Sequence, residues 1–171
     1  MPHYCDIAPG HPIHGPYHDK EYGFPSKNES VIFERMALEI MQAGLSWEIV
    51  LKKRAAMQKA FDGFEADKVA VYTAKDVERL LGEEVIIRNR KKIEAIIANA
   101  AVIQTIRGSH GSLAKWLDSH AGQGKEAWVK VMRKTFRFMG PEIVGEFLMS
   151  LGYLEGAHRE SCPVYAKIRG R

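Results

Sequence analysis

Runs of apolar residues at helical spacing, each opened by a capping residue, recur along most of this 171-residue chain. Asn28 or Ser30 can cap the first run, and Ser46 can cap the next. Thr73 and Asp76 form a variant of the capping box for a third. No Asn-Gly or Asp-Gly dipeptide separates alternating apolar segments, as it would in a hairpin of strands. The sequence therefore predicts an all-α fold.

The expected helices are interrupted by short punctuation, beginning with Gly44, which breaks the first from the second. Residues 1–27 are rich in Pro, Gly and His and carry no long periodic run, so we expect an irregular N-terminal segment. A chain of this length with 46% apolar residues predicts a single domain over residues 1–171. The expected helices lie at about 29–43, 47–61, 74–81, 90–106, 112–119, 125–136 and 141–151.

The charge balance permits a polyanionic partner without requiring one. The formal net charge is +4, and many basic proteins bind no nucleic acid. No stretch approaches the ~18 to 20 apolar residues of a membrane span. Residues 1–10 lack an apolar signal core, so we expect a cytoplasmic protein.

The two cysteines, Cys5 and Cys162, lie near opposite ends of the sequence. A structural disulfide is improbable in the cytoplasm, which leaves a metal site or two unrelated thiols. If 158–162 is one turn of helix, His158 and Cys162 share a face and can chelate one ion, with Cys5 and His18 as a second pair. Such a closed tetrahedral site would be structural. By spacing alone, the alternative that these residues are unrelated stays open.

Several segments resemble, in order and spacing, motifs of the DNA-3-methyladenine glycosylase I family. Residues 17–23 read Y-H-D-K-E-Y-G, and residues 38–47 read L-E-I-M-Q-A-G-L-S-W. Each segment is weakly specific alone, but together they span nearly the whole chain. The remaining matches are the segments 51–54, 86–93, 95–100 and 136–141 and the His158–Cys162 pair.

The resemblance implies a helix-hairpin-helix fold with one structural zinc ion joining the two ends of the chain. Cys5, His18, His158 and Cys162 fall on the family's ligand positions. In this division, residues 1–27 and 152–171 form the zinc-joined ends, and residues 28–151 form the helical body. The implied activity is monofunctional hydrolysis of the N-glycosidic bond of alkylated purines, most of all 3-methyladenine, in double-stranded DNA. No organic cofactor is implied, and we expect a monomer.

An enzyme that acts on a base within a duplex must extrude it, which requires a pocket, a wedge and a grip on the backbone. Glu39 is the expected catalytic residue, because a carboxylate in an apolar helix is costly to bury unpaired and can stabilise a cationic base. A solvated or salt-bridged helix glutamate is the alternative. Tyr17, Trp47 and His14 are expected to bind the base, although aromatic residues more often pack in a core. Gln42 and Leu45 are wedge candidates, and the predicted phosphate grip is Arg88, Asn89, Arg90, Lys91 and Lys92.

The sequence departs from the family pattern at several positions. Ile7 and Tyr22 replace tryptophans, and His14 replaces a pocket tyrosine. Val85 replaces a hairpin glycine, so we expect a remodelled turn, since a β-branched side chain disfavours positive φ. In the last long helix, the run 144–146 replaces a more aromatic run. Two other functions therefore remain in view: a zinc-joined DNA-binding module without catalysis, and an enzyme with a cysteine nucleophile.

Overall fold

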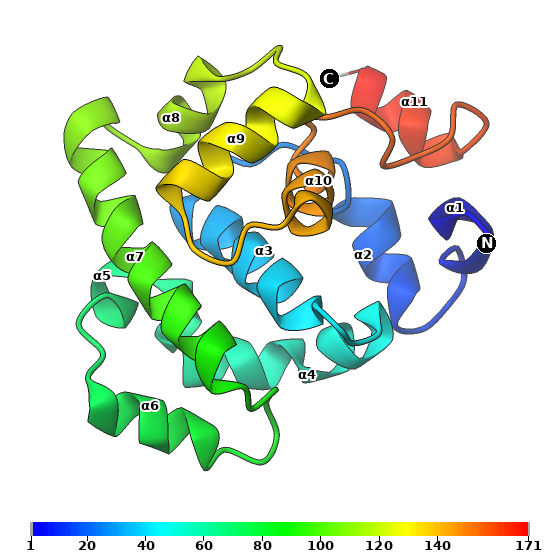
Figure 1. The fold of residues 1–171 in the computed structure, drawn as a ribbon. Helices are drawn as coiled ribbons and strands as arrows, with labels where there is room; N and C mark the ends of the chain where they lie inside the picture. Colours follow the sequence, from blue (N-terminus) through cyan, green and yellow to red (C-terminus); the bar gives the residue numbers. More distant parts are fainter. Residues whose placement is uncertain (1, 171) are drawn as a thin grey trace.

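Helices provide all the regular secondary structure of residues 2–170, the part of the chain that this computed structural model describes, and no strand forms there. The predicted all-α fold is therefore confirmed (Figure 1). The helices are α1 (Tyr4–Ile7), α2 (His14–Lys20), α3 (Glu29–Gln42), α4 (Trp47–Ala60), the 3-10 turn η1 (Asp62–Phe64), α5 (Ala66–Val69), α6 (Ala74–Leu81), α7 (Arg90–His110), α8 (Leu113–Ser119), α9 (Lys125–Thr135), α10 (Pro141–Ser150) and α11 (Pro163–Arg169).

Helix α3 forms the centre of the core. It packs against α4, α7, α8 and α10, and residues 32–41 are buried without interruption. A helix that is buried on every side belongs in the interior of a domain. Three of these buried residues are charged, namely Glu34, Arg35 and Glu39, and each must therefore have a partner or a function.

The predicted caps are largely confirmed. Asn28 accepts a hydrogen bond from the Val31 amide at 3.2 Å, and Ser46 accepts one from the Ile49 amide at 3.3 Å. The capping box of Thr73 opens α6. The long helix after the hairpin continues to residue 110, four residues beyond its predicted end. Periodicity did not predict the short helices α1, α2, α5 and α11, because one or two turns carry few apolar positions.

The prediction of an irregular segment over residues 1–27 was wrong, since it contains α1 and α2. The condition of one helical turn over 158–162, under which His158 and Cys162 would share a face, is not met. Those residues form a turn, closed by a 2.9 Å hydrogen bond from the Cys162 amide to the Arg159 carbonyl, and Cys162 precedes the first residue of α11. A turn brings the two side chains together as well as a helix would.

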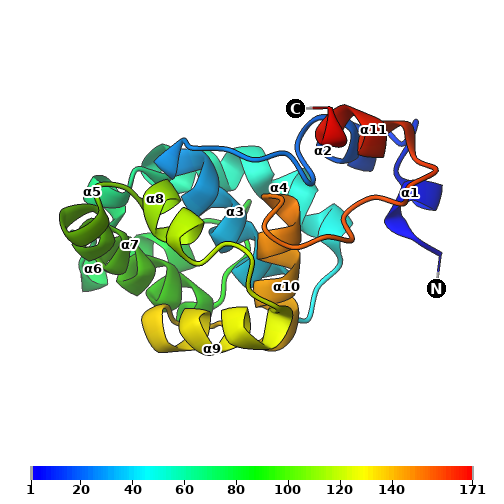
Figure 2. The same ribbon diagram turned by 90° about the horizontal axis from the view of Figure 1, so that it is seen from above.

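The two ends of the described chain lie at the same end of the molecule, where α1, α2 and α11 gather beside the helical body (Figure 2). Arg159 and Asp6 form a bidentate ion pair with two 2.7 Å hydrogen bonds. Gly23 permits the close approach of these segments. It has φ +89°, and a Cβ there would lie 2.9 Å from Ile168 Cδ1 and 3.3 Å from His158 Cδ2.

The segment 82–89 between α6 and α7 accommodates Val85 without a positive φ at that residue. Val85 is exposed, whereas Ile86 and Ile87 are buried and anchor the segment in the core. The turn is thus compatible with the loss of the family's glycine. The two helices and their short connection fit the expected helix-hairpin-helix, which stays a prediction.

Lys92 does not present its ammonium group to solvent, in contrast to the predicted phosphate grip. It is 5% exposed, and its Nζ donates to the carbonyl oxygens of Met41 at 2.8 Å and Ala43 at 2.6 Å. These carbonyls end α3 and have no intrahelical partner. Burial lowers the pKa of Lys92. Lys92 therefore joins the start of α7 to the end of α3.

Replacing Lys92 by methionine is expected to lower the free energy of unfolding by about 1–3 kcal/mol, because two carbonyls lose their charged donor. Chemical unfolding measures this value. Lys91→Met is the matched control, since Lys91 is the exposed neighbour, and it should change stability by less than about 0.5 kcal/mol. Equal stability of the two variants would contradict the role given to Lys92.

Candidate functional site

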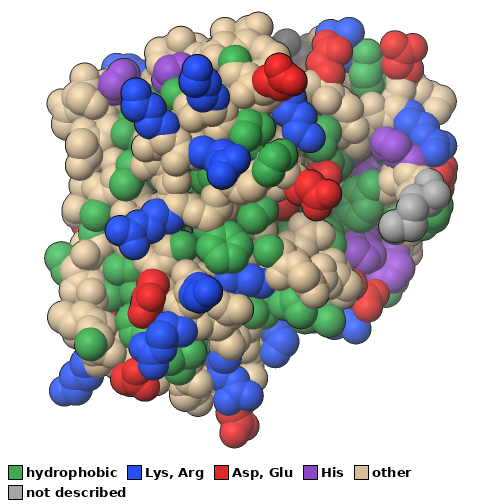
Figure 3. All heavy atoms as spheres, viewed as in Figure 1, with side chains coloured by type: hydrophobic (Ala, Val, Ile, Leu, Met, Phe, Trp, Pro, Cys, Tyr) green, Lys and Arg blue, Asp and Glu red, His purple; other side chains and the backbone are tan. Residues whose placement is uncertain are grey.

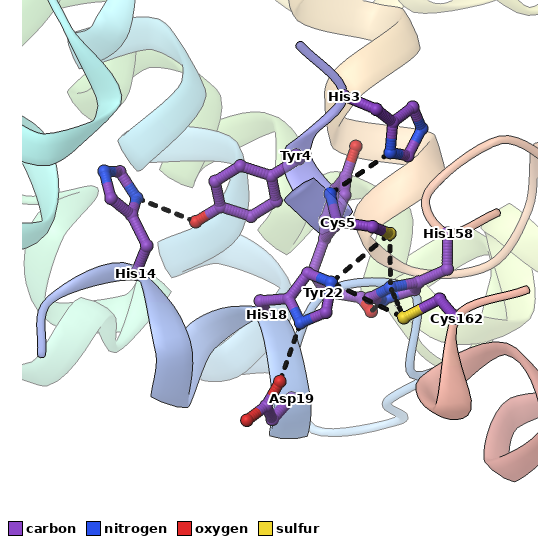
Figure 4. Close-up of polar contacts among 9 residues, drawn as sticks. All are labelled: His3, Tyr4, Cys5, His14, His18, Asp19, Tyr22, His158 and Cys162. Carbon is purple, nitrogen blue, oxygen red and sulfur yellow. Dashed lines mark hydrogen bonds and ion pairs between the residues drawn. The ribbon is translucent and has the colours of Figure 1, made fainter. Parts of the chain in front are cut away.

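Cys5, His18, His158 and Cys162 bring their ligand atoms together at the junction of the chain's two ends (Figure 4). His18 Nε2 lies 3.4 Å from Cys5 Sγ and 3.8 Å from Cys162 Sγ. His158 Nδ1 lies 3.6 Å and 3.8 Å from the same sulfurs. Zinc–ligand bonds of ~2.0 to 2.3 Å in a tetrahedron imply nitrogen–sulfur distances of about 3.6 Å. The residues therefore fit a tetrahedral metal ion.

The second nitrogen of each imidazole is held by a hydrogen bond, which fixes the ring and the tautomer. His18 Nδ1 donates to Asp19 Oδ1 at 2.7 Å, and His158 Nε2 donates to the Tyr22 carbonyl at 2.6 Å. Metal-ligating histidines almost always have such a partner. Burial raises the pKa of the Cys5 thiol, so that a bound cation would be needed to hold it as thiolate.

A cavity of about 180 Å³ lies between this cluster and the helical body. Its walls come from α1, α2, α3, α4 and α10 and from the turn after α2. This volume is smaller than that of a site for a drug-sized ligand and suits a single small planar molecule. The lining residues are Tyr4, Tyr17, Tyr22, Glu39, Gln42, Trp47 and Glu146.

Glu39 is buried in the wall of this cavity, as predicted, with 5% of its surface exposed. Among residues 2–170 its carboxylate makes no hydrogen bond and no ion pair. Burial raises the pKa of Glu39 well above its usual range, the nearby Glu146 carboxylate raises it further, and Arg35 lowers it. The alternative of a solvated or salt-bridged glutamate is thereby excluded, and the carboxylate is available to a ligand.

Glu146 places a second carboxylate in the same cavity. Its Oε2 accepts a 3.0 Å hydrogen bond from the Tyr22 hydroxyl. Burial raises the pKa of Glu146, whereas the Tyr22 hydroxyl and Lys125 lower it. No Lys, Arg or His side chain is among the residues that line the 180 Å³ cavity. When these two carboxyl groups ionise, no cation in the cavity wall offsets their charge.

The predicted aromatic residues Tyr17 and Trp47 are brought together in the cavity wall. Their ring centroids lie 5.2 Å apart, and Tyr17 is stacked on Tyr22 at 5.7 Å. Tyr17 lies directly before the ligand His18 and is held from behind by Arg35 and Arg54, whose guanidinium carbons lie 5.8 and 5.9 Å from its ring centroid. The aromatic wall is thus fixed by the cluster on one side and by cations on the other.

His14 does not line the cavity, in contrast to its predicted contact with the base. Its Nδ1 lies 2.9 Å from the hydroxyl of Tyr4, which does line it (Figure 4). His14, which replaces a pocket tyrosine of the family, therefore orients the hydroxyl of Tyr4.

The small cavity opens into a larger hollow of about 880 Å³, because Glu39, Gln42 and Glu146 line both. The wedge candidates Gln42 and Leu45 lie at its rim. Leu45 is 40% exposed, so its side chain is accessible from the hollow. Gly44 separates the two with φ +80°, a conformation that favours glycine.

The hairpin residues Arg88, Asn89, Arg90 and Lys91 are exposed. Asn89 caps α7 by accepting a 3.1 Å hydrogen bond from the Lys92 amide. Arg90 pairs with Glu78 at 2.6 Å. Because Lys92 joins α7 to the end of α3, the hairpin lies beside the segment that carries Gln42 and Leu45.

A second group of candidate ligands consists of His11, His14 and Glu48. His11 Nδ1 accepts hydrogen bonds from the amides of Ile13 and His14, at 3.1 and 3.2 Å. The neutral ring therefore carries its proton on Nε2, the atom that faces Glu48 at 3.4 Å. A protonated nitrogen cannot bind a metal, so this group is better explained as a hydrogen-bonded pair on the surface.

Sequence reasoning missed three residues of the cavity: Tyr4, Tyr22 and Glu146. Tyr4 directly precedes the candidate ligand Cys5, just as Tyr17 directly precedes His18, and this parallel could have predicted that Tyr4 also lines the cavity. Tyr22 and Glu146 were noted only as departures from the family's pattern. Their mutual hydrogen bond, over 124 positions of sequence, could not be read from either segment alone.

Comparison with known proteins agrees with this arrangement. The family model for methyladenine glycosylase matches residues 8–130. A DNA-3-methyladenine glycosylase of Haemophilus influenzae is 33% identical over 166 residues, covering 86% of this chain and 89% of the relative. DNA-3-methyladenine glycosylase 1 of Escherichia coli is 46% identical over 96 residues, covering 56% of this chain and 51% of the relative.

Solved structures give the same result. A 3-methyladenine DNA glycosylase I in complex with 3-methyladenine superposes with a TM-score of 0.85 at 32% identity, covering 94% of this chain and 96% of the other. The enzyme of Staphylococcus aureus superposes with a TM-score of 0.83, also at 32% identity, covering 94% of this chain and 95% of the other. The family model covers most of the chain, and the structural similarity covers 94% of it. The chain belongs to the methyladenine glycosylase family.

Proposed function

We propose that this protein is a monofunctional DNA glycosylase that removes alkylated purines, most of all 3-methyladenine, from double-stranded DNA and leaves an abasic site. The observation that carries the proposal is the unpartnered carboxylate of Glu39 in a cavity walled by aromatic side chains. A buried carboxylate is costly without a partner, and a cationic base supplies one. The names and bound base of the relatives support the same substrate class.

In the proposed reaction the methylated base is itself a good leaving group, and the cavity residues orient it and stabilise charge. The bond between the sugar's anomeric carbon and the base nitrogen breaks, and its electron pair stays on the base. The cationic base thereby leaves as a neutral molecule. Water adds to the anomeric carbon and releases a proton to solvent. Because the leaving group is already good, the enzyme needs orientation and electrostatic stabilisation more than a strong general base.

The proposed roles follow from position in the cavity. Glu39 is the catalytic residue, which accepts from the amino edge of the flipped base and stabilises its charge. Tyr17 and Trp47 supply flat faces, and stacking on such faces is worth ~1–3 kcal/mol per base. Gln42 and Leu45 fill the gap in the duplex, since a flipped base leaves a vacant step.

Exposed cations support a DNA-binding face around the cavity mouth. Lys and Arg side chains are distributed over the face that α6, α7 and α9 present (Figure 3). Several of them form no ion pair among the described residues and are free to contact phosphates. They are Arg88 and Lys91 of the hairpin and Lys125, Lys130, Arg133, Lys134 and Arg137 of α9 and the loop after it. Those of α9 were not predicted from the sequence.

We further propose that the metal is one structural zinc ion held by Cys5, His18, His158 and Cys162. Two thiolates and two imidazoles suit zinc and leave no coordination position for water. The residues around it form zinc-joined ends, 1–27 and 152–171, on a helical body of residues 28–151, and the whole acts as one domain and as a monomer. With both thiols committed to zinc, a cysteine nucleophile has no support.

The site of action of the enzyme would be the bacterial cytoplasm, where its DNA is. Among residues 2–170, no helix combines the length and the hydropathy that crossing a membrane requires.

The proposal is tested by incubating the zinc-loaded protein with methylated duplex DNA and identifying the released bases by chromatography. We expect release of 3-methyladenine and none from unmethylated DNA. A folded, zinc-loaded sample that releases no methylated base would favour the non-catalytic DNA-binding module, which would still bind the duplex.

The pH dependence of base release is expected to depend on the ionisation of Glu39 and on the charge of Glu146. Glu39 must be ionised to stabilise a cation, so activity falls as the pH drops through its raised pKa. Burial is the main cause of that raised pKa and the Glu146 carboxylate is the second, whereas Arg35 opposes it; the pKa values of Tyr4, Tyr17 and Tyr22 are also raised, so these tyrosines stay neutral. Glu146→Gln should therefore move the acidic limb of kcat/KM to lower pH. An unmoved limb would show that a different group controls it.

A further inference from the structure

Glu146 reaches the cavity from α10. It lines both the 180 Å³ cavity and the 880 Å³ hollow. Only one of its oxygens, Oε2, has a hydrogen-bond partner among the described residues, the Tyr22 hydroxyl. The other oxygen is free to accept from a ligand.

The charge of the cavity also requires an explanation. Glu39 and Glu146 approach from different helices, α3 and α10, and the Glu146 carboxylate disfavours ionisation of Glu39. The two cations that act on these carboxylates, Arg35 on Glu39 and Lys125 on Glu146, do so from outside the 180 Å³ cavity. Arg35 lies behind Tyr17 and donates to the Ser150 carbonyl at 2.6 Å, and Lys125 is at the rim of the outer hollow. A neutral ligand would leave two carboxylates facing each other, whereas a cationic ligand would offset both.

We infer that Glu146 is a second substrate-binding carboxylate, which makes the cavity selective for cationic alkylated purines over neutral bases. The inference rests on the proposed function for the identity of the substrate, but the selectivity is a property of the cavity itself. The two carboxylates contact separate edges of the flipped base. One stabilises the amino edge, and the other stabilises the charge of the ring.

This role predicts an effect on binding more than on chemistry. In the bound substrate the positive charge is on the base, and in the transition state it moves towards the sugar. An interaction that favours the charged base is thus no stronger in the transition state than in the bound substrate, so its loss raises KM more than it lowers kcat. After bond cleavage the base is neutral, and the attraction that held it is lost, which favours release of the product.

The test uses two small probes that need no catalysis. The permanently cationic 3,9-dimethyladeninium ion stands for the methylated nucleoside, with a methyl group in place of the sugar, and neutral 9-methyladenine is its counterpart. Binding is followed by fluorescence, since Trp47 lines the cavity. The wild type should prefer the cation. Glu146→Gln, which keeps an oxygen for Tyr22, should lower that preference about 10- to 100-fold, as expected for one charge-assisted hydrogen bond.

Two further variants separate recognition from structure. Glu142→Gln removes an exposed carboxylate one helical turn away, which lines only the outer hollow, and should leave the preference unchanged. Tyr22→Phe removes the hydroxyl that Glu146 accepts from, and should also keep most of the preference. If Tyr22→Phe lowers the preference as much as Glu146→Gln does, then Glu146 acts only by holding Tyr22 and the inference fails.

The results also separate this inference from the proposed function. Preference for the cation that depends on Glu146, in a protein that releases no methylated base, would support the inference and overturn the function. Release of 3-methyladenine by a wild type that shows no preference, or by a Glu146→Gln variant with an unchanged preference, would keep the function and overturn the inference.

Discussion

Replacing Glu39 by glutamine is expected to lower release of 3-methyladenine at least ~100-fold, the usual effect of removing one preorganised electrostatic group from an active site. Glutamine keeps the shape and an acceptor oxygen but not the negative charge, which would stabilise the positive charge as it moves from the base towards the sugar in the transition state. Single-turnover release from methylated duplex DNA measures the change. Glu142→Gln serves as the charge-matched control outside the inner cavity. Activity within a few-fold of the wild type would remove Glu39 from the centre of the mechanism.

The same substitution should leave the protein as stable as the wild type, or more so. The pKa of Glu39 is raised by folding, so the folded state holds its proton more tightly than the unfolded state. The stability from this protonated carboxyl is present below the unfolded pKa and is lost as the pH rises through the folded pKa. Glu39→Gln should therefore gain stability relative to the wild type as the pH rises. Lower activity with equal or higher stability distinguishes a functional residue from a structural one.

Loss of the metal is the second large effect that we expect. Cys162→Ser should lose the bound equivalent of zinc and lower the unfolding temperature by about 10 °C, because a metal that binds only the folded state adds its binding energy to folding. A strong chelator should do the same to the wild type. Activity should fall with it, since Tyr4 and Tyr17 directly precede two of the ligands and form walls of the cavity.

The control for this experiment is Glu48→Gln, which alters the group formed with His11 and His14. It should retain one zinc per chain by elemental analysis. A Cys162→Ser variant with a full equivalent of zinc and an unchanged unfolding temperature would show that the four-residue cluster does not hold the ion.

The helical body was predictable because its signals are local. Asn28 and Ser46 cap their helices through side chains three residues from the amides that they bind, and periodicity extends over three or more turns. Glu39 was predicted mainly from the resemblance to the family, since a carboxylate on an apolar helix is by itself more often solvated or salt-bridged. The short helices α1, α2 and α11 were not predictable in this way, because their stability comes from packing and from the cluster more than from their own sequence.

The second carboxylate of the cavity could not have been placed from the sequence. Glu146 lies on a helix with an ordinary pattern, and only the tertiary fold shows that it faces Glu39. Lys92 was misassigned for the same reason. In sequence it belongs to a run of cations, which is normally solvated, whereas in the structure it reaches the end of α3. Tyr22 and Glu146 depart from the family's pattern, and only the hydrogen bond between them in the structure shows that both belong to the cavity.

The separation of the cluster's residues along the chain has a consequence for how the molecule folds. Cys5 and His158 are 153 positions apart, and His18 and Cys162 are 144 apart. Contacts between such distant segments form late, because closing so long a loop costs entropy that only an already ordered body can reduce. We expect the helical body to fold first and the two ends to dock on it afterwards, with zinc. On this route the cavity is the last part of the protein to be assembled, and a chain still folding has no base-binding pocket.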